Sequence, residues 1–469
     1  MTRIKQSNIE TEYKVAVDRA RNKKKTILFS YTEKLNNINP LSFYSSAKQL
    51  FQGERFFWKV PNDETYIVGL GVAQSLQTSH EEDRFKWVER EWNLLIKDAH
   101  IFNPFEVPGT GPLIFGGFSF DPLSVKEQEW SLFSNALFHL PNLMLVINGQ
   151  EAYITMNIIC STKESGESLK RVLALKEKIF TVKERENLTI IESLREHEIN
   201  PDEWKEAVGE VVRALKEDND LNKVVMARKM NIEFNELISS EKVLEHLCKG
   251  QQDSYIFALE IMNSCFTGAS PERLVKKSGN DVLSACLAGS IKRDSNEKRD
   301  AMLGQDLLAD MKNRHEHQLV VSMIEDVIQK FCTEVAIPKE PSILKMRDIQ
   351  HLFTPVKGKI KDQNISILSL VEELHPTPAM GGVPTKDALK VIREMEKMDR
   401  GFYAAPIGWI DYRANGEFAV AIRSGLIKEN EAFLYAGCGV VSDSNPEDEY
   451  YETRIKFRPM LRALGGKML

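Results

Sequence analysis

The chain has 469 residues, enough to bury a large apolar core, and a formal net charge of −6 at pH 7. With that charge and only short basic runs, a nucleic-acid partner is not expected. Six cysteines lie far apart without a C-x-x-C spacing, which predicts free thiols and no disulfides. The N-terminus lacks a signal-peptide core and no run reaches the ~20 apolar residues that span a bilayer, so we expect a cytoplasmic protein without a membrane partner.

The first part of the chain is expected to be rich in antiparallel sheet. Residues 54–75 and 143–159 are β-branched and aromatic runs that turn at Pro-Asn-Asp and Asn-Gly, so each predicts a hairpin. Between them, residues 81–100 and 124–139 have the pattern of helices. Residues 163–198 are charged and amphipathic, which predicts a further helix.

No repeat or low-complexity linker divides the chain, so we expect one continuous body with a boundary near residue 200, between residues 1–199 and 200–469. Asn200 and Pro201 begin a predicted helix, and the two-residue alternation of residues 223–234 predicts a strand that starts at Lys223. The remaining expected elements are strands at 254–260, 264–268, 282–288, 417–427 and 431–441, and helices at 297–331, 384–398 and 446–464.

The stretch KNRHEHQLVV (312–321) places a glutamate between two histidines within the long predicted helix. His315 and His317 would point about 200° apart on a helix, so they cannot bind one ion together with Glu316. The H-E-x-x-H spacing of zinc enzymes is also absent, which disfavours a zinc hydrolase. Glu316 sits at the margin of the apolar face, where an ion-paired glutamate is the ordinary case, so a ligand role requires partners.

Partners for Glu316 are found near the C-terminus. In residues 436–461 a strand precedes a helix that Asn445 is expected to cap. On that helix Glu449, Glu452 and Lys456 share one polar face. Two carboxylates there and Glu316 would suit Mg²⁺, which takes hard oxygen ligands. A surface ion-pair face would show the same pattern, and the spacing alone leaves both open.

Eight motifs then follow one another in a fixed order. They are GASPERL (268–274), LAGS (287–290), KNRHEHQLV (312–320), IQHL (349–352), ELHPTPA (373–379), AVAIRSGL (419–426), AGCGVV (436–441) and ETRIK (452–456). Their order and approximate spacing resemble those of the chorismate-utilising enzymes, which include the anthranilate, aminodeoxychorismate, salicylate and isochorismate synthases. The resemblance is strong over about residues 200–469. It implies an α/β (α+β) fold in which two large, mostly antiparallel sheets pack together with helices outside.

The resemblance also assigns roles to individual residues. It implies that Glu316 and Glu452 bind Mg²⁺ and that Glu449 is an outer-shell carboxylate. Glu272 would be the general acid that protonates the departing C4 hydroxyl, which requires burial to keep it protonated, and Lys223 the general base that activates water. The substrate-binding residues implied for chorismate are Gly289, Ser290, His351, Arg423, Gly439 and Lys456.

The nucleophile separates the branches of this family. Amination branches carry glutamine where this chain has Lys223, and the aminodeoxychorismate branch carries lysine where it has Ala288. The resemblance therefore implies isochorismate synthase, an isomerase (hydroxymutase) that adds water, without a glutaminase subunit; a monomer is the simplest assembly. The long first part resembles the menaquinone-pathway form more than the siderophore form. Salicylate synthase, which resembles this chain but carries threonine for Ala379, and a non-catalytic chorismate-binding protein are the alternatives.

Two departures from the family pattern occur near these motifs. Ala404-Ala405 replaces a usual Gly-Gly, and Cys438 replaces a common alanine. Both changes exchange one small residue for another, so we expect activity to be retained.

Overall fold

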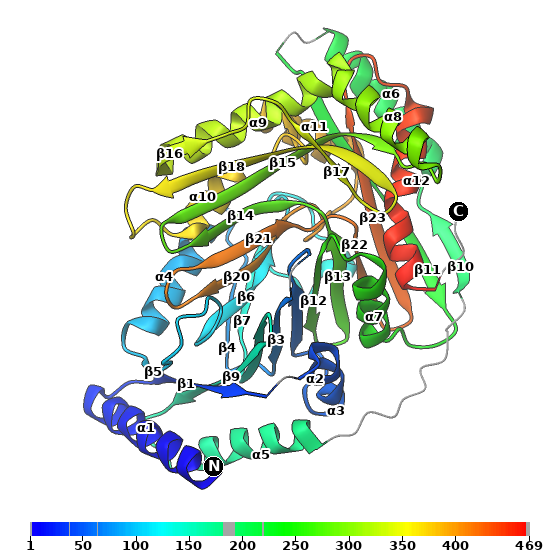
Figure 1. Ribbon diagram of the computed structural model, residues 1–469. Helices are drawn as coiled ribbons and strands as arrows, with labels where there is room; N and C mark the ends of the chain where they lie inside the picture. Colours follow the sequence, from blue (N-terminus) through cyan, green and yellow to red (C-terminus); the bar gives the residue numbers. More distant parts are fainter. Residues whose placement is uncertain (1, 37, 63, 182–192, 218–219, 466–469) are drawn as a thin grey trace.

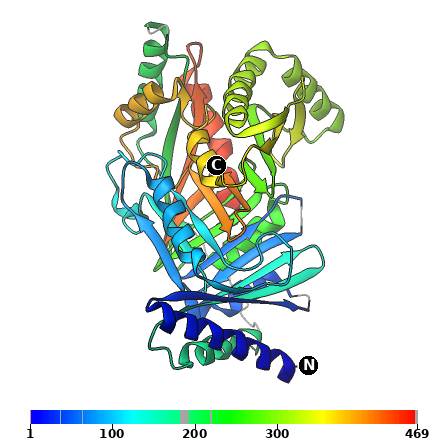
Figure 2. The ribbon, with the colours of Figure 1, turned by 90° about the vertical axis from the view of Figure 1, so that its left-hand side faces the viewer.

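A computed structural model describes residues 2–36, 38–62, 64–181, 193–217 and 220–465. Two large sheets pack face to face, and helices cover their outer faces (Figures 1 and 2). Among the described strands, all pairings are antiparallel except that of β1 with β5. The expected α/β architecture of two mostly antiparallel sheets is therefore confirmed.

The larger sheet has thirteen strands. In spatial order they are β10 (Ser193–Glu198), β11 (Lys223–Phe234), β23 (Glu431–Val440), β22 (Ser424–Lys428), β13 (Ser264–Ser270), β12 (Tyr255–Ile261), β2 (Arg55–Lys59), β3 (Thr65–Leu70), β8 (Leu143–Asn148), β9 (Glu151–Cys160), β1 (Ile27–Leu35) and β5 (His100–Phe102), with β19 (Gly382–Val383) paired to β11. Strands from before and after residue 200 meet in this sheet, since β2 pairs with β12. The boundary near residue 200 stays a prediction.

The second sheet has ten strands. They run in the order β16 (Cys332–Ala336), β18 (Ile349–Ile360), β15 (Asp281–Lys292), β14 (Arg273–Ser278), β21 (Gly416–Val420), β20 (Pro406–Asp411), β6 (Leu113–Phe118), β7 (Ala136–Leu140) and β4 (Gln74–Thr78), with β17 (Ser342–Lys345) paired to β18.

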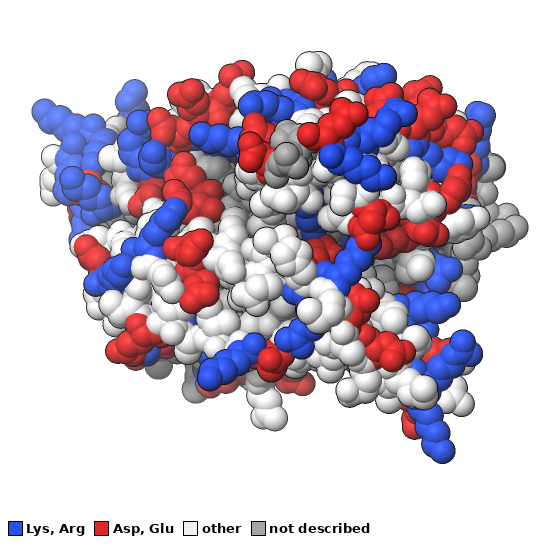
Figure 3. Space-filling model, turned by 90° about the horizontal axis from the view of Figure 1, so that it is seen from above, with Lys and Arg blue, Asp and Glu red and all other residues white. Residues whose placement is uncertain are grey.

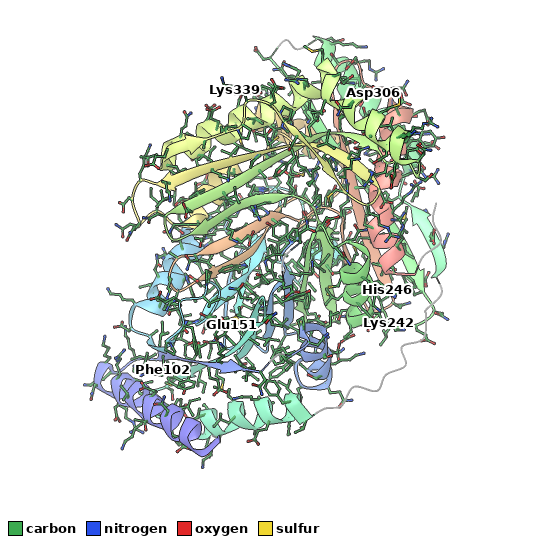
Figure 4. The ribbon with its side chains drawn as sticks, in the orientation of Figure 1. Phe102, Glu151, Lys242, His246, Asp306 and Lys339 are labelled. Atoms are coloured by element: carbon green, nitrogen blue, oxygen red, sulfur yellow. The ribbon has the colours of Figure 1, made fainter. Side chains whose placement is uncertain are left out.

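The helices complete the layers. They are α1 (Thr2–Lys23), α2 (Pro40–Ser46), α3 (Lys48–Phe51), α4 (Arg84–Lys97), α5 (Glu167–Thr181), α6 (Pro201–Glu217), α7 (Ser240–Gly250), α8 (Glu297–Ala309), α9 (Met311–Phe331), α10 (Ile367–Leu374), α11 (Thr385–Glu396) and α12 (Pro446–Ala463). Helix α9 packs on β15 and β18, whereas α12 packs on β23 and α7. In Figure 4, His246 marks α7 beside α12, where its Nδ1 lies 2.8 Å from the carbonyl oxygen of Ala463.

Both predicted hairpins form, as β2–β3 and β8–β9. The strand predicted over residues 223–234 has those bounds, and the helix predicted after Asn200 begins at Pro201. Asn445 caps α12, because its side chain accepts a hydrogen bond from the Glu447 backbone N–H at 2.9 Å. Every cysteine is a free thiol, and all but Cys248 are buried.

Four predictions of secondary structure were wrong or partly wrong. Residues 124–139 are not a helix: they hold a short 3₁₀ turn and the buried strand β7, whose apolar run fits an interior strand equally well. Residues 163–198 hold α5 and then the edge strand β10, with residues 182–192 outside the described part. The helix predicted over 297–331 is divided at Asp310, whose side chain accepts the Asn313 N–H and starts α9.

The fourth difference matters most for the site. Residues 417–427 are not one strand but β21 and β22, which belong to different sheets. The chain passes from one sheet to the other at residues 421–423, where Arg423 has φ 53°. A continuous alternation of apolar residues does not reveal that its two halves pair with different neighbours.

Charged side chains of both signs occur on the face of the molecule seen from above (Figure 3). On the face seen in Figure 3, acidic and basic side chains are interspersed, so the surface potential there has no single sign. Among the described residues no helix combines the length and the apolarity needed to cross a membrane.

Aromatic side chains fill the space between the sheets. Phe115 of β6 stacks on Phe56 of β2 with ring centroids 4.5 Å apart, and its edge meets Trp58 at 5.9 Å. All three side chains are buried. This cluster joins the two sheets through apolar contact.

We expect Phe115→Ala to lower the free energy of unfolding by about 3–5 kcal/mol, because it leaves a cavity between the sheets. Urea unfolding followed by tryptophan fluorescence measures the change. Val125→Ala is the control, since Val125 is 89% exposed and its truncation changes stability by less than about 0.5 kcal/mol. Equal effects of the two substitutions would contradict the assignment of Phe115 to the core.

Candidate functional site

A cavity of about 280 Å³ lies between α9 and α12 and is lined by strands of both sheets. In Figure 2, α8 and α9 stand on one side of the upper end of the molecule and α6 and α11 on the other. All eleven residues named from the sequence line this cavity: Lys223, Glu272, Gly289, Ser290, Glu316, His351, Arg423, Gly439, Glu449, Glu452 and Lys456. The structure therefore brings the whole set together, while the role of each residue stays a prediction.

Lys223 and Glu316 meet across the cavity. Lys223 is the first residue of β11 and is 3% exposed, and its Nζ donates to Glu316 Oε1 at 2.5 Å. Gly439 lies beside this pair, and a Cβ there would come within 2.6 Å of the Lys223 Cε atom. Glycine at position 439 thus leaves the space that the lysine side chain occupies.

Gly289 is required for a different reason. It lies at a bulge where the β15–β18 register shifts between Ala288 and Ser290. Its φ is 77°, in the left-handed region, and a Cβ would approach Asn313 of α9. The bulge turns Ser290 toward the cavity, opposite His351 in the register.

Glu272 lies two residues after the end of β13 and lines the cavity. Its side chain is buried, and that burial raises its pKa to about 8, against the lowering effect of Arg423, Lys223 and Lys456. At pH 7 this carboxyl group therefore carries a proton, as a general acid must.

Arg423 is a buried cation of the cavity lining. Its guanidinium has no hydrogen bond or ion pair with any of the described residues, although burial lowers its pKa. An arginine stays charged in that environment, and its planar fork matches a carboxylate. The left-handed backbone at the sheet crossing directs the side chain into the cavity, and the Arg423 carbonyl accepts the Ala269 N–H at 3.0 Å.

Lys456 and His351 complete this wall of the cavity. Lys456 Nζ contacts Glu452 Oε1 at 2.6 Å and donates to the Gly437 carbonyl at 2.7 Å. Burial, helped by the charges of Arg423 and Lys456, lowers the pKa of His351 to about 3. His351 is thus a neutral hydrogen-bonding group beside two cations.

Three carboxylates also line the cavity, Glu316 from α9 and both Glu449 and Glu452 from α12. Burial and the charge of Glu452 raise the pKa of Glu449, to which Ser444 Oγ donates at 2.7 Å. Burial would also raise the pKa of Glu452, but Lys456 and Arg423 outweigh it and the pKa is lowered. No group of three metal-ligating side chains is already assembled among the described residues. The donors nevertheless fit Mg²⁺, because all are hard oxygens and a cation relieves the repulsion that Glu449 experiences.

The two histidines around Glu316 diverge as expected. His315 is exposed, whereas His317 is buried with Nδ1 3.0 Å from the Ala288 carbonyl and Nε2 2.8 Å from Thr354 Oγ1. Nδ1 therefore donates to the carbonyl and Nε2 accepts from the hydroxyl. The two hydrogen bonds of His317 hold α9 against β15 and β18. Neither ring nitrogen is then free to bind a zinc ion.

Sequence reasoning missed several lining residues, among them Arg400 and Tyr403. Their only signal was an arginine and a tyrosine within an otherwise apolar loop before a strand. Both departures from the family pattern, Ala404 and Cys438, also line the cavity. Ala404 has φ 60°, the conformation that glycine adopts most easily, so the backbone there keeps the shape that a glycine would give it.

Comparisons with known proteins agree with this geometry. A family model described as chorismate binding enzyme matches residues 15–465. Isochorismate synthase MenF of Bacillus subtilis is 43% identical over 458 residues, which cover 96% of each chain. The salicylate biosynthesis isochorismate synthase of Pseudomonas aeruginosa is 34% identical over 96% of this chain and 94% of its own.

A solved structure shares the fold. MenF, the menaquinone-specific isochorismate synthase of Escherichia coli, superposes with a TM-score of 0.77 over 97% of this chain and 99% of its own, at 24% identity. At that identity the likeness concerns architecture alone. Since the family model spans nearly the whole chain and the Bacillus subtilis relative matches it end to end, this chain belongs to the chorismate-binding enzymes.

Proposed function

We propose that this protein is an isochorismate synthase that acts on chorismate. The observation that carries the proposal is that Lys223 and Glu272 line one cavity together with Arg423, whose guanidinium bonds to no residue in the described part of the chain. A buried lysine at the position where amination enzymes have glutamine favours water as the nucleophile. The similarity to MenF of Bacillus subtilis over 96% of both chains supports the same activity.

The pathway follows from the same similarity. MenF of Escherichia coli is described as menaquinone-specific, and this chain matches a MenF protein along its full length. We therefore place the protein in menaquinone biosynthesis rather than in a siderophore pathway. A cytoplasmic location, a monomeric state and the lack of a glutaminase subunit accompany the proposal as predictions.

Base and acid act at two different carbons of the substrate ring, C2 and C4. Lys223 takes a proton from water as the water oxygen bonds to C2, the ring double bonds shift, and Glu272 gives its proton to the C4 hydroxyl, which leaves as water. One water enters and one leaves, so the reaction is an isomerisation. Arg423 and Lys456 bind the enolpyruvyl carboxylate, and neutral His351 adds a hydrogen bond without a further charge.

Gly289, Ser290 and Gly439 shape the remaining wall. The bulge at Gly289 presents the Ser290 hydroxyl and nearby backbone groups to the substrate. Gly439 lets the substrate and the Lys223 side chain approach the backbone of β23. These contacts orient the ring between base and acid.

The residues that would hold Mg²⁺ are Glu316 and Glu452, with Glu449 in the outer shell. The ion would supply positive charge that neutralises and orients the ring carboxylate of chorismate. Ser444 holds Glu449 in place by its 2.7 Å hydrogen bond. The chain's own contribution is to bring one carboxylate from α9 and two from α12 to the same cavity.

A product assay tests the function directly. We expect chorismate with Mg²⁺ to yield isochorismate, separated by chromatography, and Lys223→Ala and Glu272→Gln each to lower kcat by about 10²–10⁴-fold. Salicylate and pyruvate as the main products would replace the proposal with salicylate synthase. Binding of chorismate without turnover would indicate the non-catalytic alternative, and turnover only with ammonia would contradict the role of Lys223.

The pH dependence reports on Glu272. The acid must be protonated, and its pKa of about 8 means that the protonated fraction falls above that pH. We therefore expect kcat to be lost as pH rises through about 8, approaching a tenfold loss per pH unit. The residual activity of Glu272→Gln should lack this alkaline limb. A limb that persists unchanged in Glu272→Gln would assign the titration to another group.

Metal removal tests whether Glu316, Glu449 and Glu452 bind Mg²⁺. We expect EDTA to abolish activity, Mg²⁺ to restore it, and Glu452→Gln to raise the half-saturating Mg²⁺ concentration by about 10–100-fold. A thermal shift with Mg²⁺ gives a second readout that does not depend on turnover. Glu447→Gln is the control on the same helix, because Glu447 is exposed and pairs with Lys205 instead. Full activity in EDTA would exclude a metal requirement.

A further inference from the structure

One edge of the thirteen-stranded sheet is interrupted beside the cavity. On the side of β11 away from β23, β19 pairs with Lys223 and Val224, and β10 pairs only from Met230 onward. Between these two short strands, no described strand pairs with residues 225–229. The backbone N–H and C=O groups exposed by such a gap require partners when they are buried.

Side chains and a loop take the place of the missing strand. The Val225 N–H donates to the Gly381 carbonyl at 2.9 Å, and the Val225 carbonyl accepts from Arg400 Nη2 at 2.7 Å. The Ala227 N–H donates to Glu396 Oε1 at 2.7 Å, and the Ala227 carbonyl accepts from Trp204 Nε1 at 2.9 Å. All four outward groups of Val225 and Ala227 are thus satisfied.

Arg400 and Glu396 form the central part of this patch. Arg400 Nε donates to Glu396 Oε2 at 2.9 Å, and Nη2 also donates to Glu396 Oε1. Both side chains are buried, at 3% and 1% exposure. The guanidinium lies 4.2 Å from the centre of the Phe120 ring, which covers it on one face.

The guanidinium of Arg400 also bonds to the loop that contains Ala379 and Met380. Arg400 Nη1 donates to the carbonyl of Met380 at 3.0 Å, and Met380 and Ala379 also line the cavity. These bonds engage four of the five N–H groups of Arg400. Arg400 lines the cavity, yet these hydrogen bonds go to the Glu396 carboxylate and to two backbone carbonyls of the protein.

We propose that the Arg400–Glu396 pair is a positioning device, which holds the β11 end that carries Lys223 against the Ala379–Met380 loop. The inference rests on the proposed function, because it concerns the placement of the base in that reaction. Val225 is two residues from Lys223 on a strand, so a shift of its carbonyl moves the lysine backbone. Arg400 acts through this backbone and does not touch the reacting atoms.

The test compares two buried arginines in one protein. Arg400→Gln should lower kcat for isochorismate formation by about 10–100-fold, because a displacement of the base of about 1 Å has that effect. KM for chorismate should change by less than about threefold, since no substrate contact is lost. Arg400→Lys should restore only part of kcat, because one ammonium group cannot reach Glu396, Val225 and Met380 together.

Arg55→Gln is the matched control. Arg55 is 3% exposed, pairs with Glu260 and Glu241, and lies away from the cavity lining. It should lower the melting temperature as Arg400→Gln does, while kcat per folded molecule is retained. Hydrogen exchange at the Val225 and Ala227 amides should accelerate in Arg400→Gln and stay unchanged in Arg55→Gln.

The possible results separate clearly. Equal kcat in the two glutamine variants would overturn the positioning role, and a rise in KM alone would make Arg400 a substrate ligand. If Arg400→Gln does not fold, Glu396→Gln and Arg400→Lys provide the same comparison with kcat, KM and exchange. A wild-type protein that forms no isochorismate contradicts the proposed function instead, and amide exchange then still decides whether Arg400 holds the edge of β11.

Discussion

The contact between Lys223 and Glu316 sets the geometry on which the cavity depends. Lys223 belongs to the larger sheet, and Glu316 to the helix that covers the smaller one, so a distance of 2.5 Å fixes two layers relative to each other. A lysine with 3% exposure requires such a partner, because a buried polar group without a hydrogen bond is unfavourable. Gly439 leaves space for the Lys223 side chain, and the hydrogen bond of His317 to the Ala288 carbonyl holds α9 against β15.

The same cavity gives its carboxylates opposite protonation states. Burial dominates at Glu272 and raises its pKa to about 8, whereas Lys456 and Arg423 lower the pKa of Glu452 and hold it ionised. Carboxyl groups with separated pKa values can divide the work of proton donation and charge binding. Burial and neighbouring charge, rather than residue type, therefore distinguish the acid from the candidate metal ligand.

The sequence predicted most of the site because its residues lie in recognisable motifs, and the alternation of residues 223–234 predicted the strand that carries Lys223. It did not predict the sheet crossing at Arg423, since alternation is the same whichever sheet a strand joins. The helix assigned to residues 124–139 failed for a related reason, because an apolar run is compatible with both structures. Arg400 was missed because its function depends on backbone groups far away in the sequence.

Side chains cover the edge of β11 because β19 pairs with this strand at only two residues. A Cβ on Gly382 would lie 2.1 Å from the Lys223 carbonyl oxygen, and Gly382 has φ 137°, so the chain reaches β11 only through glycine. Three residues later it enters α11, and β19 ends after Val383. The part of the β11 edge beyond β19 therefore has no neighbouring strand among the described residues. Arg400 and Glu396, four residues apart, supply a donor and an acceptor to that edge, and their charges make these hydrogen bonds stronger than those of neutral side chains.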